Sequence, residues 1–85
     1  MNVRIPTPLH SYTGTGQVQA RGDTLAAVLA DLDHQFPGIR FRIVDEQNRT
    51  RRHMRLFVNQ RAVFDLSHPL QDSDEVAIVQ ALSGG

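Results

Sequence analysis

One strong helical pattern, with strand-like patterns before and after it, constrains the fold of this chain most. Five apolar residues recur at steps of three and four, which places them on one helical face: Leu25, Val28, Leu29, Leu32 and Phe36. Asp23 and Thr24 are both suitable N-cap residues, and Pro37-Gly38 is a stop signal. Because the chain has only 85 residues, this helix must bury its apolar face against a sheet formed by the remaining sequence.

Alternation of apolar and polar residues predicts the strands. The predicted strands are residues 3–5, 17–20, 53–58, 62–64 and 75–81, with a further short extended piece at 41–44. Gly14 and Gly16 lie in a predicted hairpin turn, and Asn59-Gln60 is predicted to form a tight turn. Proline cannot donate to a ladder, so we expect the first strand to be irregular near Pro6 and Pro8.

The resulting order is strand, strand, helix, strand, strand, strand. This is an α+β pattern, and a small β-grasp fold fits it, with one main helix covering a mixed sheet of four to five strands. We expect residues 1–81 to form this domain and residues 82–85 to form a flexible C-terminal tail. The core is predicted to include Leu25, Leu29, Leu32, Leu56, Val58 and Ile78.

Composition excludes several classes of protein. About 40% of residues are hydrophobic and 21% are charged, which is typical of a globular domain. No apolar run approaches the roughly 20 residues of a membrane helix, and the N-terminus lacks an apolar signal region, so we expect a cytoplasmic protein without a membrane partner. The chain has no cysteine, which excludes disulfides and thiolate chemistry. All nine basic residues are arginine, so no side chain can accept an isopeptide link.

Charge is unevenly distributed although the net charge is zero. The stretch from Arg40 to Arg61 holds seven arginines against Asp45 and Glu46, and an acidic stretch from Asp65 to Glu75 follows. This asymmetry predicts a basic face and an acidic face that steer a charged partner. Two solvated loops would produce the same pattern.

No motif predicts a catalytic residue or a metal site. The four histidines lack the i, i+3 or i, i+4 spacing with which a helix holds a metal. Gly14-Thr15-Gly16 is part of a phosphate-loop pattern, but it precedes a strand where such a loop would begin a helix.

The sequence finishes with Leu82, Ser83, Gly84 and Gly85 directly after the last predicted strand. Glycine lacks a Cβ, so a diglycine can be drawn extended into a narrow channel where an enzyme reaches its carboxylate. A carboxylate is a poor acyl donor, but transfer of AMP from ATP makes a mixed anhydride that a sulfur or nitrogen nucleophile attacks.

This region resembles the end of the MoaD/ThiS family of ubiquitin-like sulfur carriers. The resemblance rests on the following residues: Leu70, Asp72, Asp74-Glu75-Val76-Ala77-Ile78 and Gly84-Gly85, with Leu56-Phe57-Val58-Asn59 and Val63 upstream. Two departures are Ser73, where the family often has glycine, and Gln80-Ala81, where many members have proline.

The resemblance implies a ubiquitin-like β-grasp fold and a carrier that is not itself an enzyme. An E1-like partner would use ATP to adenylate Gly85, the product would become a thiocarboxylate, and the sulfur would pass to a biosynthetic enzyme for molybdopterin, thiamin or sulfur amino acids. The carrier itself would bind no cofactor. Leu82, Ser83 and Gly84 would complete the tail. By position, Val79 lies near where family members dock an apolar residue on the partner, and Phe57 and Phe64 are other candidates for partner binding. Core packing is the preferred role of each.

Two other functions remain open. The activated Gly85 could be transferred to lysines of other proteins, which would make the chain a modifier. Alternatively, Arg49, Arg51, Arg52 and Arg55 could bind RNA phosphates. The RNA interpretation is disfavoured because the cluster lacks interleaved aromatic residues and leaves the diglycine unexplained.

Overall fold

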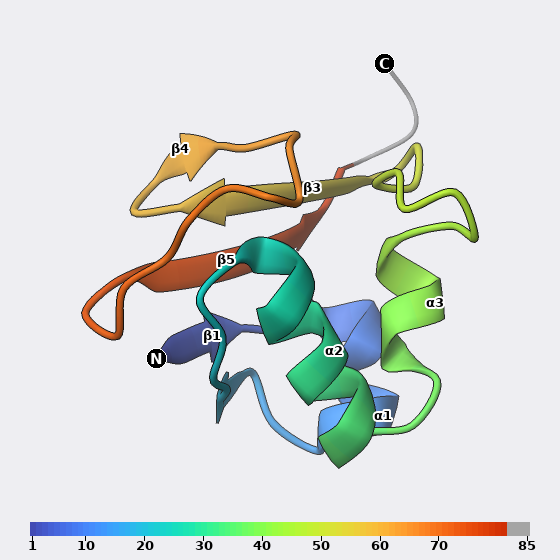
Figure 1. Cartoon of the computed structure of the whole chain (residues 1–85). Coiled ribbons are helices and arrows are strands. Elements are labelled where there is room, and N and C mark those ends of the chain that lie inside the picture. The colour runs from blue at the N-terminus through green and yellow to red at the C-terminus, as the bar shows by residue number, and fades with distance from the viewer. Residues whose placement is uncertain (82–85) are drawn as a thin grey trace.

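A computed structural model describes residues 1–81, which form a five-stranded sheet with helices packed against it (Figure 1). The strands are β1 (Asn2–Arg4), β2 (Gln17–Gln19), β3 (Met54–Val58), β4 (Arg61–Ala62) and β5 (Glu75–Gln80). The helices are η1 (Thr7–Leu9), α1 (His10–Thr13), α2 (Leu25–Gln35) and α3 (Ile39–Ile43). The strand order is β2-β1-β5-β3-β4, with β1 and β5 parallel and every other pair antiparallel. The predicted α+β class and mixed sheet are confirmed.

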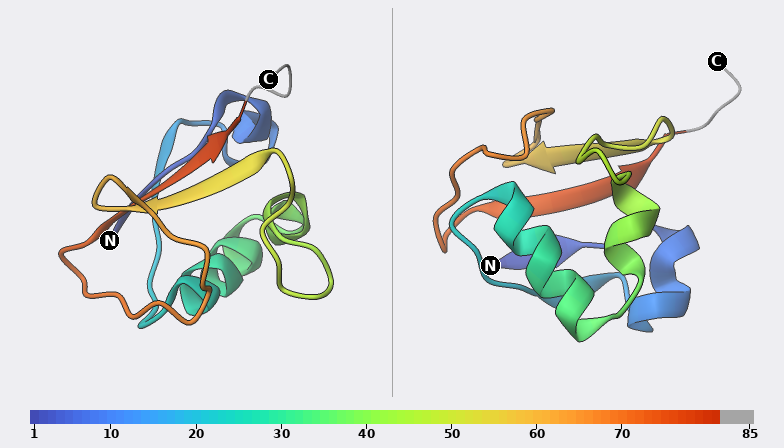
Figure 2. Two further views of the ribbon diagram at one scale, coloured as in Figure 1. Left: turned by 90° about the horizontal axis from the view of Figure 1, so that it is seen from above. Right: turned by 45° about the vertical axis from the view of Figure 1, so that its right-hand side comes forward.

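Helix α2 begins and ends where its sequence signals predict. The Thr24 side-chain oxygen accepts a hydrogen bond from the Ala27 backbone N–H at 3.1 Å, which caps the first turn. The helix ends before Pro37-Gly38, and Gly38 has a positive φ of 96°. Figure 2 shows α2 and α3 on the same face of the sheet. Four large apolar residues of α2 are fully buried there: Leu25, Val28, Leu29 and Leu32.

The segment predicted to be extended at residues 41–44 is instead helical up to Ile43, so that prediction is wrong. Helix α3 turns Ile39 and Ile43, four residues apart, toward the core, where both are 0% exposed. Phe41 lies between them and is turned out to solvent, with 55% of its surface exposed. Only Val44, which follows the helix, is extended and forms a bridge with Thr50.

The prolines after β1 start helical turns and do not form an irregular strand. Pro6 precedes η1, Pro8 lies within its first turn, and Leu9 is buried. The predicted hairpin nevertheless forms around this insertion, because Val3 pairs with Val18 and the Ile5 N–H donates to the Gly16 carbonyl at 2.8 Å.

The core lies between the helices and the inner face of the sheet. All six predicted core residues are buried: Leu25, Leu29, Leu32, Leu56, Val58 and Ile78. Within residues 1–81, no polar or charged residue is buried. Apolar burial therefore provides the main favourable term in the folding of this domain.

Candidate functional site

Strand β5 leads the chain toward its last four residues. It is the central strand, paired with β1 on one side and β3 on the other. The backbone N–H of Ala81 donates to the His53 carbonyl at 2.7 Å, so the strand is hydrogen-bonded up to the last described residue. Leu82, Ser83, Gly84 and Gly85 lie outside the described residues, and the predictions made for them stay predictions.

Two of the predicted partner-binding residues lie on the outer face of the sheet. On β5 the inward residues Val76 and Ile78 are buried, so Val79 points outward and is 41% exposed. Phe57 on β3 points to the same outer face and pairs with Ala77 of β5. Val79 also borders a surface hollow lined by Pro6 and Pro8 from the insertion after β1.

Phe64 lies apart from that pair. It follows β4 outside any strand, and it is 76% exposed. It borders one hollow with Arg52 and Arg55 and another with Asp65 and His68. The exposure of Phe64 and Val79 excludes core packing as their role, whereas Phe57 is half-buried.

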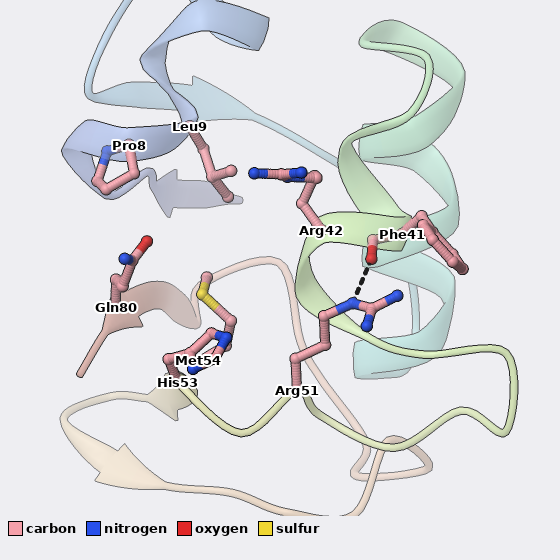
Figure 3. A pocket seen from close by; sticks show the side chains of 8 residues that line it. All are labelled: Pro8, Leu9, Phe41, Arg42, Arg51, His53, Met54 and Gln80. Carbon is pink, nitrogen blue, oxygen red and sulfur yellow. Dashed lines mark hydrogen bonds between the residues drawn. The ribbon is translucent and has the colours of Figure 1, made fainter. Parts of the chain in front are cut away.

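A pocket of about 440 Å³ opens beside the end of β5, where residues from distant parts of the sequence meet (Figure 3). Its lining residues are Pro8, Leu9, Phe41, Arg42, Arg51, His53, Met54 and Gln80. The Arg51 Nε donates to the Phe41 carbonyl at 2.5 Å, and its guanidinium carbon lies 4.4 Å from the centroid of the Phe41 ring. The sequence pattern did not predict that Phe41 and Arg42 line a pocket. The four-residue spacing of Ile39 and Ile43 was the one signal for the helix that carries them.

The acidic stretch lies at the end of β5 away from the pocket, and its carboxylates accept hydrogen bonds that stabilise turns. The Asp74 carboxylate accepts from the backbone N–H of Gln71 and from the side-chain amide of Asn59, which lowers the pKa of this carboxyl. The Ser67 side chain and backbone N–H lower the pKa of Asp65 in the same way. The acidic stretch therefore lies at one end of the sheet, together with Arg61, whereas Arg42 and Arg51 lie at the other end beside the pocket.

The part of the chain that the structure describes contains no group of three or more His, Asp or Glu side chains that could hold a metal ion. No described helix is long and apolar enough to cross a membrane.

Comparisons with known proteins identify the family. The sequence matches the ThiS family over residues 3–85. It is 38% identical to the sulfur carrier protein CysO of Mycobacterium tuberculosis and of Mycobacterium bovis, in alignments that cover 100% of this chain and 98% of each relative.

Solved structures agree with this assignment. The crystal structure of Mycobacterium tuberculosis CysO matches with a TM-score of 0.89 and 36% identity, covering 95% of this chain and 98% of that one. A chain of the Amycolatopsis orientalis BexX/CysO complex matches with a TM-score of 0.90 and 32% identity, covering 99% and 98%. The predicted ubiquitin-like β-grasp fold is thereby confirmed. These relatives also confirm the prediction that the chain is a sulfur carrier and not an enzyme. The chain belongs to the ThiS family.

Proposed function

We propose that this chain carries sulfur on the carboxylate of Gly85. A carboxylate oxygen attacks the α-phosphorus of ATP in an E1-like partner, and pyrophosphate leaves. Hydrosulfide, HS⁻, then attacks the carbonyl carbon of the acyl adenylate, a C–S bond forms, and AMP leaves. The resulting thiocarboxylate donates its sulfur to a biosynthetic enzyme.

One observation carries this proposal: the family match runs over residues 3–85 and therefore includes both glycines. Gly84 has no Cβ, so it allows close approach of channel backbone on every side of the chain. The partner supplies ATP and the catalytic groups, and the carrier supplies the acyl group. No cofactor needs to bind to the carrier.

A relative of this chain assembles with a protein named BexX, which supports a protein partner here as well. Of the destinations that the family resemblance implies, we favour cysteine biosynthesis, because the aligned curated relatives are CysO carriers. We place the reaction in the cytoplasm, where ATP is available to the partner.

We assign the outer face of the sheet around Val79, Phe57 and Ala77 to docking on the activating enzyme. Val79 and Phe57 lie on adjacent strands of one face, and Val79 is close to the end of β5 from which the tail departs. Burial of such a patch on binding would be favourable, at roughly 25 cal/mol per Å² of apolar surface. Phe64 lies beyond β4 and provides a separate contact.

The test is to isolate the protein from its native cells, treat it with a thiol alkylator and locate adducts by fragment mass spectrometry. The chain contains no cysteine, so an adduct at Gly85 identifies a thiocarboxylate. Localisation is required because oxidation of Met1 or Met54 changes the intact mass by nearly the same amount as exchange of oxygen for sulfur.

If no adduct forms at Gly85 and Gly85 is found linked to lysines of other proteins, the function is protein modification and not sulfur transfer. Absence of both products would contradict activation of Gly85 altogether.

A further inference from the structure

Positive charge is concentrated where β5 ends. We propose that a basic surface formed by Arg42, Arg51, Arg52, His53 and Arg55 docks an acidic segment of the adenylating partner, at the rim of the channel that receives the tail. This inference rests on the proposed function, since it names the chemistry of the partner that activates Gly85.

Strand pairing places the basic surface beside the tail. Strands β3 and β5 are antiparallel, with Met54 opposite Gln80, so the residues just before β3 lie at the end of β5. The hydrogen bond from Ala81 to the His53 carbonyl fixes this proximity. Arg42 reaches the same place from α3, across the pocket shown in Figure 3.

The charge of this surface is not neutralised within the described residues. Their one ion pair, Arg4 with Glu75 at 3.9 Å, lies elsewhere. The side chains of Arg42 and Arg52 are exposed, and within residues 1–81 neither has a hydrogen bond or an ion pair. The Asp45 carboxylate interacts electrostatically with Arg51, but its Oδ1 accepts hydrogen bonds from the backbone N–H groups of Gln47 and Arg49.

Two of the arginines are held in place by contacts within the chain, before any partner binds. Arg51 is fixed by Phe41 through its Nε hydrogen bond and the stacked ring. The Arg55 Nη1 donates to the carbonyls of Arg52 and Met54 at 2.9 and 2.8 Å. A guanidinium that is already ordered loses less entropy when it binds a carboxylate, and its planar donors match both carboxylate oxygens.

The pocket and the far end of β5 indicate what the partner segment is. Leu9, Met54 and Pro8 give the pocket an apolar wall next to the cationic groups, which suits a segment with carboxylates and an apolar side chain. Glu75 lies at the other end of the strand, about 17 Å from Gln80 for five residue steps. Asp74 precedes it, and Asp65 borders the same hollow as Asp74. An acidic partner is therefore attracted to the tail end and repelled by the opposite end, so it meets the carrier tail first.

The experiment measures ATP–pyrophosphate exchange by the adenylating enzyme, purified from native cells by its carrier-dependent exchange activity. The test variant is Arg42→Gln/Arg52→Gln, which removes two exposed charges and breaks no side-chain hydrogen bond of the described residues. The matched control is Arg21→Gln/Arg61→Gln, which removes two exposed charges away from the tail. Thermal melting checks that both variants fold.

At an ionic strength of about 0.02 M, we expect kcat/KM for the test variant to fall about tenfold with kcat unchanged. At about 0.5 M, salt screens the charges, so the loss of kcat/KM should shrink to less than about threefold. The control variant should stay within about twofold of the wild type. If fractions of the native cells show no exchange that depends on the wild-type chain, the proposed function itself is overturned. Exchange with the wild type and an equal loss, or no loss, in both variants would overturn this inference alone. Slower sulfur release with unchanged exchange would also overturn it, because the surface would then serve the sulfur acceptor.

Discussion

Gly84 contributes no side chain, and its proposed role follows from that absence. A β-branched residue restricts the backbone and widens the chain, so Gly84→Val should block entry into the activating channel. We expect pyrophosphate exchange to fall more than about 100-fold, with an unchanged melting temperature, since position 84 follows the last strand. Gly84→Ala serves as the graded control with an intermediate rate. Exchange at the wild-type rate by Gly84→Val would exclude the narrow channel.

Asp74 links the acidic turn to β3, and its titration predicts how stability depends on pH. Its pKa in the folded chain is lowered from 3.8, first by the Gln71 backbone N–H and then by the Asn59 amide. A lowered folded pKa means that the stabilisation is present above the unfolded pKa and is lost as pH falls through the folded pKa.

We therefore expect the free energy of unfolding, measured by urea titration, to decrease below about pH 4, and Asp74→Asn to show a smaller decrease over that window. Asp72→Asn is the matched control, because Asp72 is exposed and accepts no hydrogen bond among residues 1–81. An identical acid dependence of the wild type and Asp74→Asn would show that these hydrogen bonds do not persist in solution.

The junction between β2 and α2 depends on close packing against the start of the helix. A Cβ on Gly22 would lie 2.6 Å from the Val28 backbone nitrogen and 2.8 Å from the Ala27 Cβ. Helical backbone cannot yield as a flexible side chain can, so Gly22→Ala should lower the free energy of unfolding by about 1–3 kcal/mol. Gly16→Ala is the control, because its Cβ would only meet the His10 ring at 3.5 Å. Urea denaturation measures both, and equal stability of the two variants would contradict the observed approach of α2.

The elements differ in how far the sequence could predict them, for physical reasons. Helix α2 has a cap, a stop and an apolar face over three turns, so local signals agree. In α3 the apolar residues Ile39, Phe41 and Ile43 alternate with arginines, which is a strand period, and they also contain a helical i, i+4 pair. Burial of Ile39 and Ile43 together decides for the helix, and that burial is tertiary information.

The same limit applies to the candidate site. Val79 and Phe57 could be assigned to an outward face, because alternation along β3 and β5 fixes which side chains point away from the core. The pocket beside Gln80 could not be predicted, since Leu9, Arg42 and His53 come from three separate segments. Its position depends on the helical insertion after β1 and on α3, the two features that local patterns missed.

At the scale of the whole molecule, strand pairing determines at which end of the sheet the charged residues lie. The sequence places seven arginines in residues 40–61 and the acidic stretch in residues 65–75, without specifying their arrangement. The antiparallel pairing of β3 with β5 brings the residues before Met54 to the tail end and the turn around Asn59 to the opposite end. The end of the sheet with Arg42, Arg51 and His53 is therefore also the end of β5 after which the proposed acyl-carrying tail follows.

This arrangement gives the absence of lysine a chemical consequence. A lysine amine near an adenylated Gly85 would attack its carbonyl carbon, lose a proton and form an isopeptide bond as AMP leaves. A guanidinium stays protonated and does not attack. The Met1 amine donates to the Ala20 carbonyl at 2.8 Å. Arginine thus supplies positive charge beside the tail without supplying a nucleophile.

We predict that Arg52→Lys converts the activated carrier into a self-acylating protein. Residue 52 adjoins His53, whose carbonyl holds Ala81, and four further residues span up to about 14 Å, so the introduced amine lies within reach of Gly85. The chain is prepared with a thioester at Gly85 and incubated at about pH 8.5, where a small fraction of lysine is neutral. The wild type should only hydrolyse, whereas Arg52→Lys should lose the thiol and form an isopeptide bond between the introduced amine and Gly85. The rate should be independent of protein concentration, since the reaction is intramolecular. Arg21→Lys, on the segment before α2, controls for an amine elsewhere on the surface. Hydrolysis alone in Arg52→Lys would show that the tail end does not bring position 52 to the acyl group, and arginine would then be preferred there for its binding geometry only.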